Sequence, residues 1–103
     1  MFKFDDFLKI APQSLQRILS EVANDVLLVA LKGASPNVRD YFLVNVTKSK
    51  ADRLRFEMEG LPPVRVQEVE SKQREVVQVA RRLEDQRIVS LDRTNSDTSA
   101  NLI

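Results

Sequence analysis

Cysteine and histidine are both absent from this chain of 103 residues. Without cysteine there is no disulfide framework and no thiolate nucleophile. Without either residue there is no thiolate or imidazole ligand for a metal ion, and no side chain that titrates unaided near neutral pH. Most common catalytic arrangements are therefore excluded, and we expect a protein that is not an enzyme, with no catalytic residues, cofactor or metal site.

An excess of one charge is also missing. The chain has 16 Lys and Arg against 15 Asp and Glu, for a formal net charge of +1. Nucleic-acid binding usually needs a strongly basic face, and no polybasic membrane anchor is present. No stretch approaches the roughly 20 apolar residues of a membrane helix, and Asp5 and Asp6 interrupt any signal-like run. We therefore expect no nucleic-acid partner and no direct membrane insertion.

Glycine is scarce, and its two positions are informative. Gly33 and Gly60 each follow a helical pattern, and the four prolines fall at helix starts or turns. Ser35 is a predicted N-cap, whereas Pro62 and Pro63 prevent the preceding helix from continuing. This sparse punctuation predicts an all-α fold, a compact bundle of about six helices in one domain.

Apolar residues recur with the period of an α-helix. For example, Leu15, Ile18, Leu19 and Val22 are spaced i, i+3, i+4, i+7. The expected helices cover a short segment at 4–9, then a helix from Pro12 to about 22, a helix over 25–32 capped by Asn24, a helix from Pro36 to about 46, a helix over about 48–59 capped by Thr47, and a long last helix over about 66–86.

Two segments are less certain in type. The six apolar residues 26–31 fit a buried helix or a strand, and helix is favoured because Gly33 follows as a stop and no alternating partner run exists. Residues 87–91, which read RIVSL, are expected to extend against the body as an irregular strand. Residues 92–103 are mostly polar without periodicity, so we expect a disordered tail.

Four stretches occur in an order that carries a resemblance to a known family. They are MFKF at the start, LQRILSEV, LLVALKGAS, and PPVRVQEVESKQREVVQVARRLEDQRIV. In this order and spacing the chain resembles the C-terminal torque domain of the flagellar motor switch protein FliG, whose members carry an M-F-x-F motif, an ALKGA sequence and a GPVR…RRLE…IV ending. The resemblance covers residues 1 to about 90.

The resemblance implies a non-catalytic rotor domain of the armadillo-related superhelical type. In that family the domain sits in the cytoplasmic C-ring of the flagellar basal body, at the cytoplasmic face of the inner membrane. Charged residues on its fifth helix meet a cytoplasmic loop of the stator protein MotA. The domain reorients about M-F-x-F when the chemotaxis response regulator binds the ring. The implied partners are MotA or an equivalent stator, FliM and neighbouring FliG subunits in a ring homo-oligomer, and the isolated domain is expected to be monomeric.

The resemblance also divides the chain. Residues 1–5 are the expected hinge segment, residues 6–91 the helical torque domain, and residues 92–103 the tail. The hinge residues would be Met1, Phe2 and Phe4, and Met1 would be an internal residue of a longer protein. The alternative for the two phenylalanines is that they only pack the first helix onto the bundle.

Alignment on ALKGAS and PPVR transfers the family's charges one by one. The family lysine falls on Lys32, the later arginine on Arg65, and the second acid of a pair on Glu57. The family's fifth-helix arginine falls on Ser49, and the first acid falls on Phe56, so these two charges are absent here. This divergence leaves open whether the contact with the stator is preserved.

Helical spacing locates these residues around the 48–59 helix. Ser49, Arg53, Phe56 and Gly60 lie along one stripe, opposite the predicted core stripe. Arg53 lies one turn beyond Ser49 and can replace the missing arginine, shifted by about 6 Å. Lys50 flanks the stripe as a second replacement. The predicted stator-contact set is Lys32, Ser49, Lys50, Arg53, Phe56, Glu57 and Arg65.

Each of these assignments has a purely structural alternative. Lys32 can complement the dipole at the end of its own helix, and Arg65 can be a solvated loop charge. Glu57 can form a weak surface pair with Arg53, four residues earlier. Phe56 can pack against the turn that follows its helix, whereas an exposed aromatic side chain would suit a partner interface.

Three functions compete. The first is a stator-facing rotor domain, and the second is a divergent family member that acts as a structural or adaptor module of the ring. The third is a helix-turn-helix DNA binder, suggested by the stretch VALKGASPNV. The second helix of that stretch offers Arg39 against Asp40 and little else basic, so DNA recognition is disfavoured.

Overall fold

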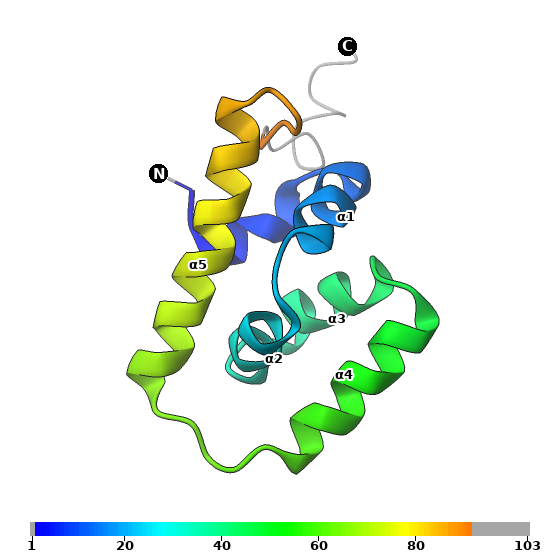
Figure 1. The fold of residues 1–103 in the computed structure, drawn as a ribbon, viewed down its shortest axis with the longest axis vertical. Helices are drawn as coiled ribbons and strands as arrows, with labels where there is room; N and C mark the ends of the chain where they lie inside the picture. The colour runs from blue at the N-terminus through cyan, green and yellow to red at the C-terminus, as the bar shows by residue number, and fades with distance from the viewer. Residues whose placement is uncertain (1, 92–103) are drawn as a thin grey trace.

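A computed structural model describes residues 2–91 and has an all-α architecture (Figure 1). The predicted fold class is confirmed, since these residues contain six helices and no strand. The first helix is of the tighter 3-10 type. The elements are η1 (Phe4–Lys9), α1 (Pro12–Ser20), α2 (Asn24–Lys32), α3 (Pro36–Val44), α4 (Lys48–Gly60) and α5 (Val66–Asp85).

Helix starts follow the predicted capping residues with one exception. The Ser35 hydroxyl accepts a hydrogen bond from the Val38 N–H at 3.4 Å, and the Thr47 hydroxyl accepts one from Lys50 at 3.2 Å. The predicted cap at Asn24 is wrong, because Ala23 has the extended backbone of an N-cap and Asn24 is the first helical residue. Since alanine offers no side-chain acceptor, α2 begins without a side-chain cap.

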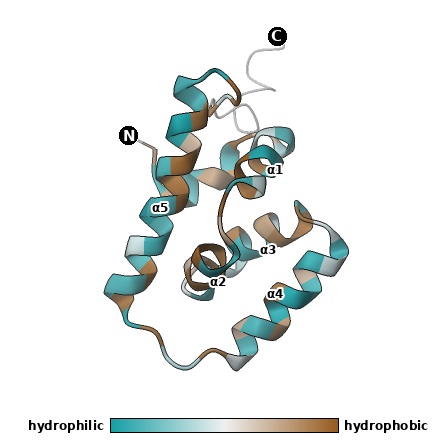
Figure 2. Cartoon of the chain, in the orientation of Figure 1, coloured by the Kyte–Doolittle hydropathy of each residue, from teal (hydrophilic) through white to brown (hydrophobic). Residues whose placement is uncertain are grey.

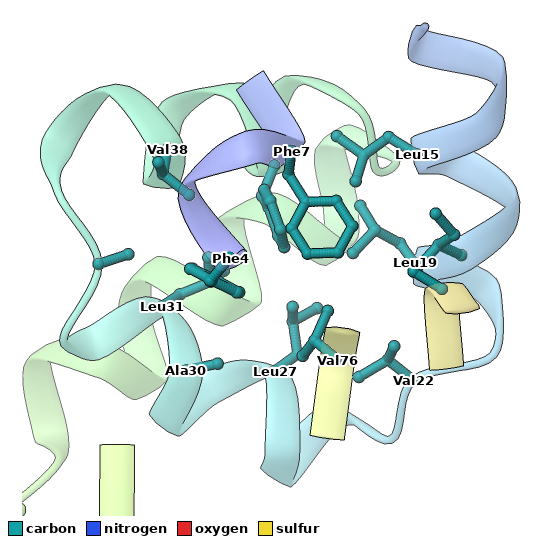
Figure 3. Packing of buried hydrophobic residues seen from close by; sticks show 14 of the residues in the cluster. Phe4, Phe7, Leu15, Leu19, Val22, Leu27, Ala30, Leu31, Val38 and Val76 are labelled. Atoms are coloured by element: carbon teal, nitrogen blue, oxygen red, sulfur yellow. The ribbon is translucent and has the colours of Figure 1, made fainter. Parts of the chain in front are cut away.

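The α2 helix lies at the centre of the domain, in contact with α4 and α5 (Figure 1). Leu27, Ala30 and Leu31 are completely buried, and Val26 and Leu28 pack partly against the same core (Figure 3). The helical interpretation of residues 26–31 is therefore confirmed. Burial on several sides explains why these residues are apolar without a clear polar face.

Gly33 ends α2 for a reason that the turn alone does not supply. Its φ of −98° is accessible to any residue, so no left-handed conformation requires glycine here. A Cβ at this position would overlap the side chain of Val69, on the first turns of α5. Glycine therefore lets α5 cross closely over the end of α2. At Gly60, the last residue of α4, a Cβ would meet nothing within 4 Å.

An aromatic cluster attaches the N-terminal segment to the bundle. The rings of Phe7 and Phe42 are almost completely buried and meet edge to face, with centroids 5.4 Å apart. Phe4 lies 5.6 Å from Phe7 and 5.3 Å from Phe42, and Phe2 lies 4.9 Å from Phe7. The packing expected as the alternative for Phe2 and Phe4 is thus present. The hinge role stays a prediction, and Met1 lies outside the described residues.

The segment after α5 is not the expected irregular strand. Arg87 adopts φ of 60°, and the N–H of Ile88 reaches back to the Leu83 carbonyl at 2.9 Å. This pattern is a Schellman ending, which reverses the chain at the C-terminus of the helix. Val89 and Leu91 are then buried as single apolar side chains rather than as paired strand residues. The expected disorder of residues 92–103 lies outside the described part of the chain.

Hydropathy differs sharply among the helices. In Figure 2, α4 is drawn mostly in the hydrophilic colour, whereas hydrophobic colour gathers on α2, α3 and the inner side of α5. No helix within residues 2–91 combines the length and the apolar composition that crossing a bilayer requires. The polar helix α4 is the one on which most of the predicted site residues lie.

Candidate functional site

The α4 helix packs through one narrow face. It contacts α2 and α3, and its buried residues are Ala51, Leu54 and Met58. This spacing is the inner stripe that the sequence predicted, and it leaves the opposite side of the helix open to solvent. Thr47 caps the start of the helix, so the polar sequence of α4 is helical from Lys48 onward.

The open side of α4 carries Ser49, Arg53 and Phe56, all exposed as predicted. The side chain of Phe56 is 77% exposed, so the alternative in which it packs against the following turn is wrong. Large apolar side chains that project from a polar face contribute strongly to interfaces when a partner covers them. Phe56 therefore contributes little to the packing of the bundle.

The charges on α4 are partly paired along the helix. Asp52 and Arg55 form an ion pair at 3.6 Å, with both side chains more than half exposed. The alternative pair is not formed, because Arg53 and Glu57 make no ion pair with each other within residues 2–91. Exposed pairs contribute little to stability in any case. The outer face thus presents one unpaired cation and one unpaired anion beside Phe56.

Lys32 lies at the C-terminal end of α4, although it belongs to α2. Its Nζ donates a hydrogen bond to the Met58 carbonyl oxygen at 3.1 Å, and the side chain is half-buried. Lys32 is also the last residue of α2, as the structural alternative requires, and its ammonium in addition lies at the negative end of the dipole of α4. The fold brings this predicted site residue against the last turn that carries Glu57.

The other two predicted cations lie at opposite ends of α4. Lys50, in its first turn, lines a groove of about 420 Å³ that also includes Gln16 and the exposed Val44. Arg65 is the last residue of the connection 61–65 and is exposed at the start of α5, where its carbonyl accepts hydrogen bonds from the first turn. The predicted residues therefore follow α4 along its length and continue across the connection to α5.

Arg39 has a structural role that the sequence did not reveal. Its guanidinium donates to the carbonyl oxygens of Leu31 and Ala34, both at 3.1 Å, and of Lys32 at 3.4 Å. This arginine was considered only as a possible DNA contact, yet its donors are bound to the end of α2. A helix end without a left-handed residue needs such donors, but only the fold identifies which side chain supplies them.

Metal binding has no support from side-chain placement. Residues 2–91 contain no group of three or more Asp or Glu side chains arranged to hold a metal ion. The exposed side of α4 carries one large apolar side chain, charges of both signs and hydrogen-bonding groups.

Sequence comparison identifies relatives over most of the chain. The family model described as the FliG C-terminal domain matches residues 1–91. The flagellar motor switch protein FliG of Vibrio cholerae is 36% identical over 85 residues, which cover 82% of this chain and 24% of that protein. FliG of Pseudomonas aeruginosa is 41% identical over 83 residues, covering 81% and 25%. The chain thus spans about a quarter of the length of the curated relatives it matches.

Solved structures share the fold. A crystal structure of FliG residues 116–343 from H. pylori superposes with a TM-score of 0.85 at 26% identity, covering 89% of this chain and 40% of that chain. Full-length FliG from Aquifex aeolicus gives a TM-score of 0.80 at 36% identity, covering 84% and 27%. Family model, relatives and folds agree across nearly the same residues, and the chain therefore belongs to the FliG C-terminal domain family.

Proposed function

We propose that this chain works as part of the flagellar rotor, in the C-ring at the cytoplasmic face of the inner membrane, and that α4 contacts the cytoplasmic loop of a MotA-type stator protein to generate torque. One observation carries this proposal. Phe56 is 77% exposed on α4, beside Arg53 and Glu57, which form no ion pair with any residue in the range 2–91. Such a face has no role in stabilising the bundle, and it lies on the helix that the family uses for its motor charges.

The mechanism is complementarity that forms and breaks as the rotor moves. Exposed charge pairs are individually weak and are screened by salt, so they exchange partners without a large barrier. Phe56 adds an apolar contact that loses its water on docking. Together Arg53, Phe56 and Glu57 give a contact strong enough to transmit force in one position and weak enough to release for the next. No step in this mechanism needs a catalytic group.

Switching of the rotation sense is assigned to the N-terminal segment. We infer that the domain reorients about residues 1–5 when the chemotaxis response regulator binds a ring that also contains FliM and neighbouring FliG subunits. The burial of Phe4 against Phe7 and Phe42 supports this assignment. Because Phe4 is fixed to the bundle, a rotation imposed ahead of it turns the whole domain.

A second function is favoured by the two lost charges. Ser49 and Phe56 occupy positions where the family carries an arginine and an acid, as the alignment indicates. A divergent member could hold the ring together as a structural or adaptor module without driving rotation. In that case the exposed side chains of α4 would contribute nothing to torque.

A charge exchange on α4 distinguishes the two functions. The test variant is Arg53→Glu with Glu57→Arg, which keeps net charge and helix length but inverts the outer face. The control is Asp52→Arg with Arg55→Asp, which also keeps net charge but exchanges two side chains of the same helix that already pair with each other. We expect swarming to fall strongly in the test variant and only slightly in the control, with both proteins present at equal level. Normal swarming in the test variant would contradict the proposal that α4 contacts the stator.

A further inference from the structure

We propose that Lys32 and Arg39 are positioning residues, which together fix the last turn of α4 relative to α2, and that Lys32 does not itself contact the stator. The consequence for partner binding rests on the proposed function of α4. The mechanical part of the proposal, a clamp between two helix ends, rests only on contacts within residues 2–91.

The last turn of α4 has few donors for its carbonyl groups. The final four carbonyls of any helix lack intrahelical partners, and the residues that follow normally supply some of them. Here Pro62 and Pro63 follow, and neither has a backbone N–H. The N–H of Leu61 reaches the Met58 carbonyl at 3.3 Å. Because residues 62 and 63 add no donor, a cation from another part of the chain stabilises this end of α4 further.

Lys32 supplies that cation. Its ammonium lies 3.1 Å from the same Met58 carbonyl oxygen, and it brings a positive charge to the negative end of the helix dipole. The side chain is half-buried, and it lines two separate grooves, one with Val64 and Val66 and one with Leu43. Lys32 thus separates two neighbouring grooves, and its side chain lies along the surface and does not extend into solvent.

Arg39 makes this arrangement possible. The last carbonyls of α2 also lack intrahelical partners, and these are the acceptors nearest in sequence to the Lys32 ammonium. The Arg39 guanidinium donates to two of them, on Leu31 and Lys32, and to the Ala34 carbonyl in the turn that follows. With its own helix end satisfied by an arginine of α3, Lys32 extends to α4 instead. The two cations therefore divide two helix ends between them.

The clamp lies directly under the candidate contact surface. Met58 follows Phe56 and Glu57 in the same helical turn, so a loosened Met58 carbonyl allows this turn to fray. Fraying would change where Phe56 and Glu57 point without altering either residue. If Lys32 only positions the turn, neutralising it should lower the affinity for the partner and leave the salt dependence of binding unchanged. If Lys32 contacts an acidic group of the partner, neutralising it should make binding less dependent on salt.

The first experiment measures amide hydrogen exchange and binding together. Lys32→Met keeps the side-chain length without the charge or the donor, and Lys32→Arg restores both. The control is Lys48→Met, which removes an exposed cation at the other end of α4 that is outside the predicted stator-contact set. We expect Lys32→Met to accelerate exchange in residues 58–61 about two- to fivefold. We also expect it to weaken binding to a purified MotA cytoplasmic-loop fragment by a similar factor, with an unchanged salt slope. Lys32→Arg should restore both values.

Three outcomes separate the parts of the proposal. Unchanged exchange at residues 58–61 in Lys32→Met would overturn the clamp, whatever happens to binding. Faster exchange with a reduced salt slope would mean that Lys32 contacts the partner directly, which also overturns the proposal. A third outcome is faster exchange in Lys32→Met, with the affinity for the MotA fragment unchanged in both Lys32→Met and Phe56→Ala. This result would support the clamp and would overturn the stator contact proposed for α4.

The second experiment tests Arg39, which does not donate to α4. Arg39→Met removes all three hydrogen bonds at the end of α2, and Arg39→Lys is a milder variant should the first fail to fold. If Arg39 frees Lys32 to reach α4, exchange at residues 58–61 should rise about twofold in either variant, as expected for a displaced helix-end charge. Faster exchange confined to the α2–α3 turn would show that the two cations act separately.

Discussion

The neighbouring helices α2 and α4 differ in what stabilises them. The α2 helix has nine residues, lies between α4 and α5, and has no side-chain cap. The α4 helix has 13 residues, only three of them buried, and begins at a capping threonine. Stability of α2 therefore comes from tertiary burial, whereas α4 depends on its cap and one inner stripe. The difference implies that substitutions on the outer face of α4 change binding without changing the fold.

The largest effect should come from the centre of α2. Leu27→Ala removes a completely buried side chain, and we expect a loss of about 2–5 kcal/mol in the free energy of unfolding. Urea unfolding followed by far-UV circular dichroism measures this loss. A cost below about 1 kcal/mol would mean that α2 is not the core element that its burial indicates.

The next effect concerns the crossing of α2 by α5. Gly33→Ala places a Cβ against Val69, a stiff β-branched side chain, so we expect a loss of about 1–3 kcal/mol. Val69→Ala in the same protein should recover part of that loss. The matched control is Gly60→Ala at the end of α4, where space is free and a stabilisation of up to about 1 kcal/mol is expected. Equal melting temperatures for the two alanine variants would contradict the close approach.

A smaller effect separates the starts of the two helices. Thr47→Ala removes the cap of α4 and should cost about 1 kcal/mol. Ala23→Ser adds a capping hydroxyl to α2 and should stabilise the protein by about 0.5–1 kcal/mol. Thermal melts of both variants compare these values. If Ala23→Ser destabilises, α2 has no room for a cap and the contrast with α4 is sharper than proposed.

The smallest effect should be on the outer face of α4. Phe56→Ser is expected to change the free energy of unfolding by less than about 0.5 kcal/mol, because the ring is mostly in water already. The same variant should reduce swarming if α4 contacts the stator. A large loss of stability would place Phe56 in the bundle and invalidate the comparison between the two helices.

Most of the fold could be predicted from the sequence because capping residues, glycines and prolines mark the helix ends locally. Ser35 and Thr47 gave two starts, and the helical period gave the exposed position of Phe56. The prediction was wrong where no such residue marked the change of chain direction. The reversal after α5 uses Arg87 in the left-handed region, which a glycine would have signalled and an arginine does not.

The helix-end contacts of Lys32 and Arg39 were out of reach for another reason. Their acceptors lie 26 residues away for Lys32 and five to eight residues away for Arg39. Which helix end each cation reaches depends on how α2, α3 and α4 pack, and no sequence spacing encodes that packing. Charges at helix termini are therefore the least predictable members of this candidate site.

The contact pattern of the bundle also describes how a load applied at α4 would travel. One route runs from α4 through α3 to η1, and another runs from α4 through α2 and α5 to η1. Both routes converge on the segment that begins at Phe4, and neither follows the extended connection between α4 and α5 (Figure 1). Two parallel contact paths therefore join α4 to the N-terminal segment. A force applied to α4 is expected to displace the domain as one rigid body at its N-terminal attachment.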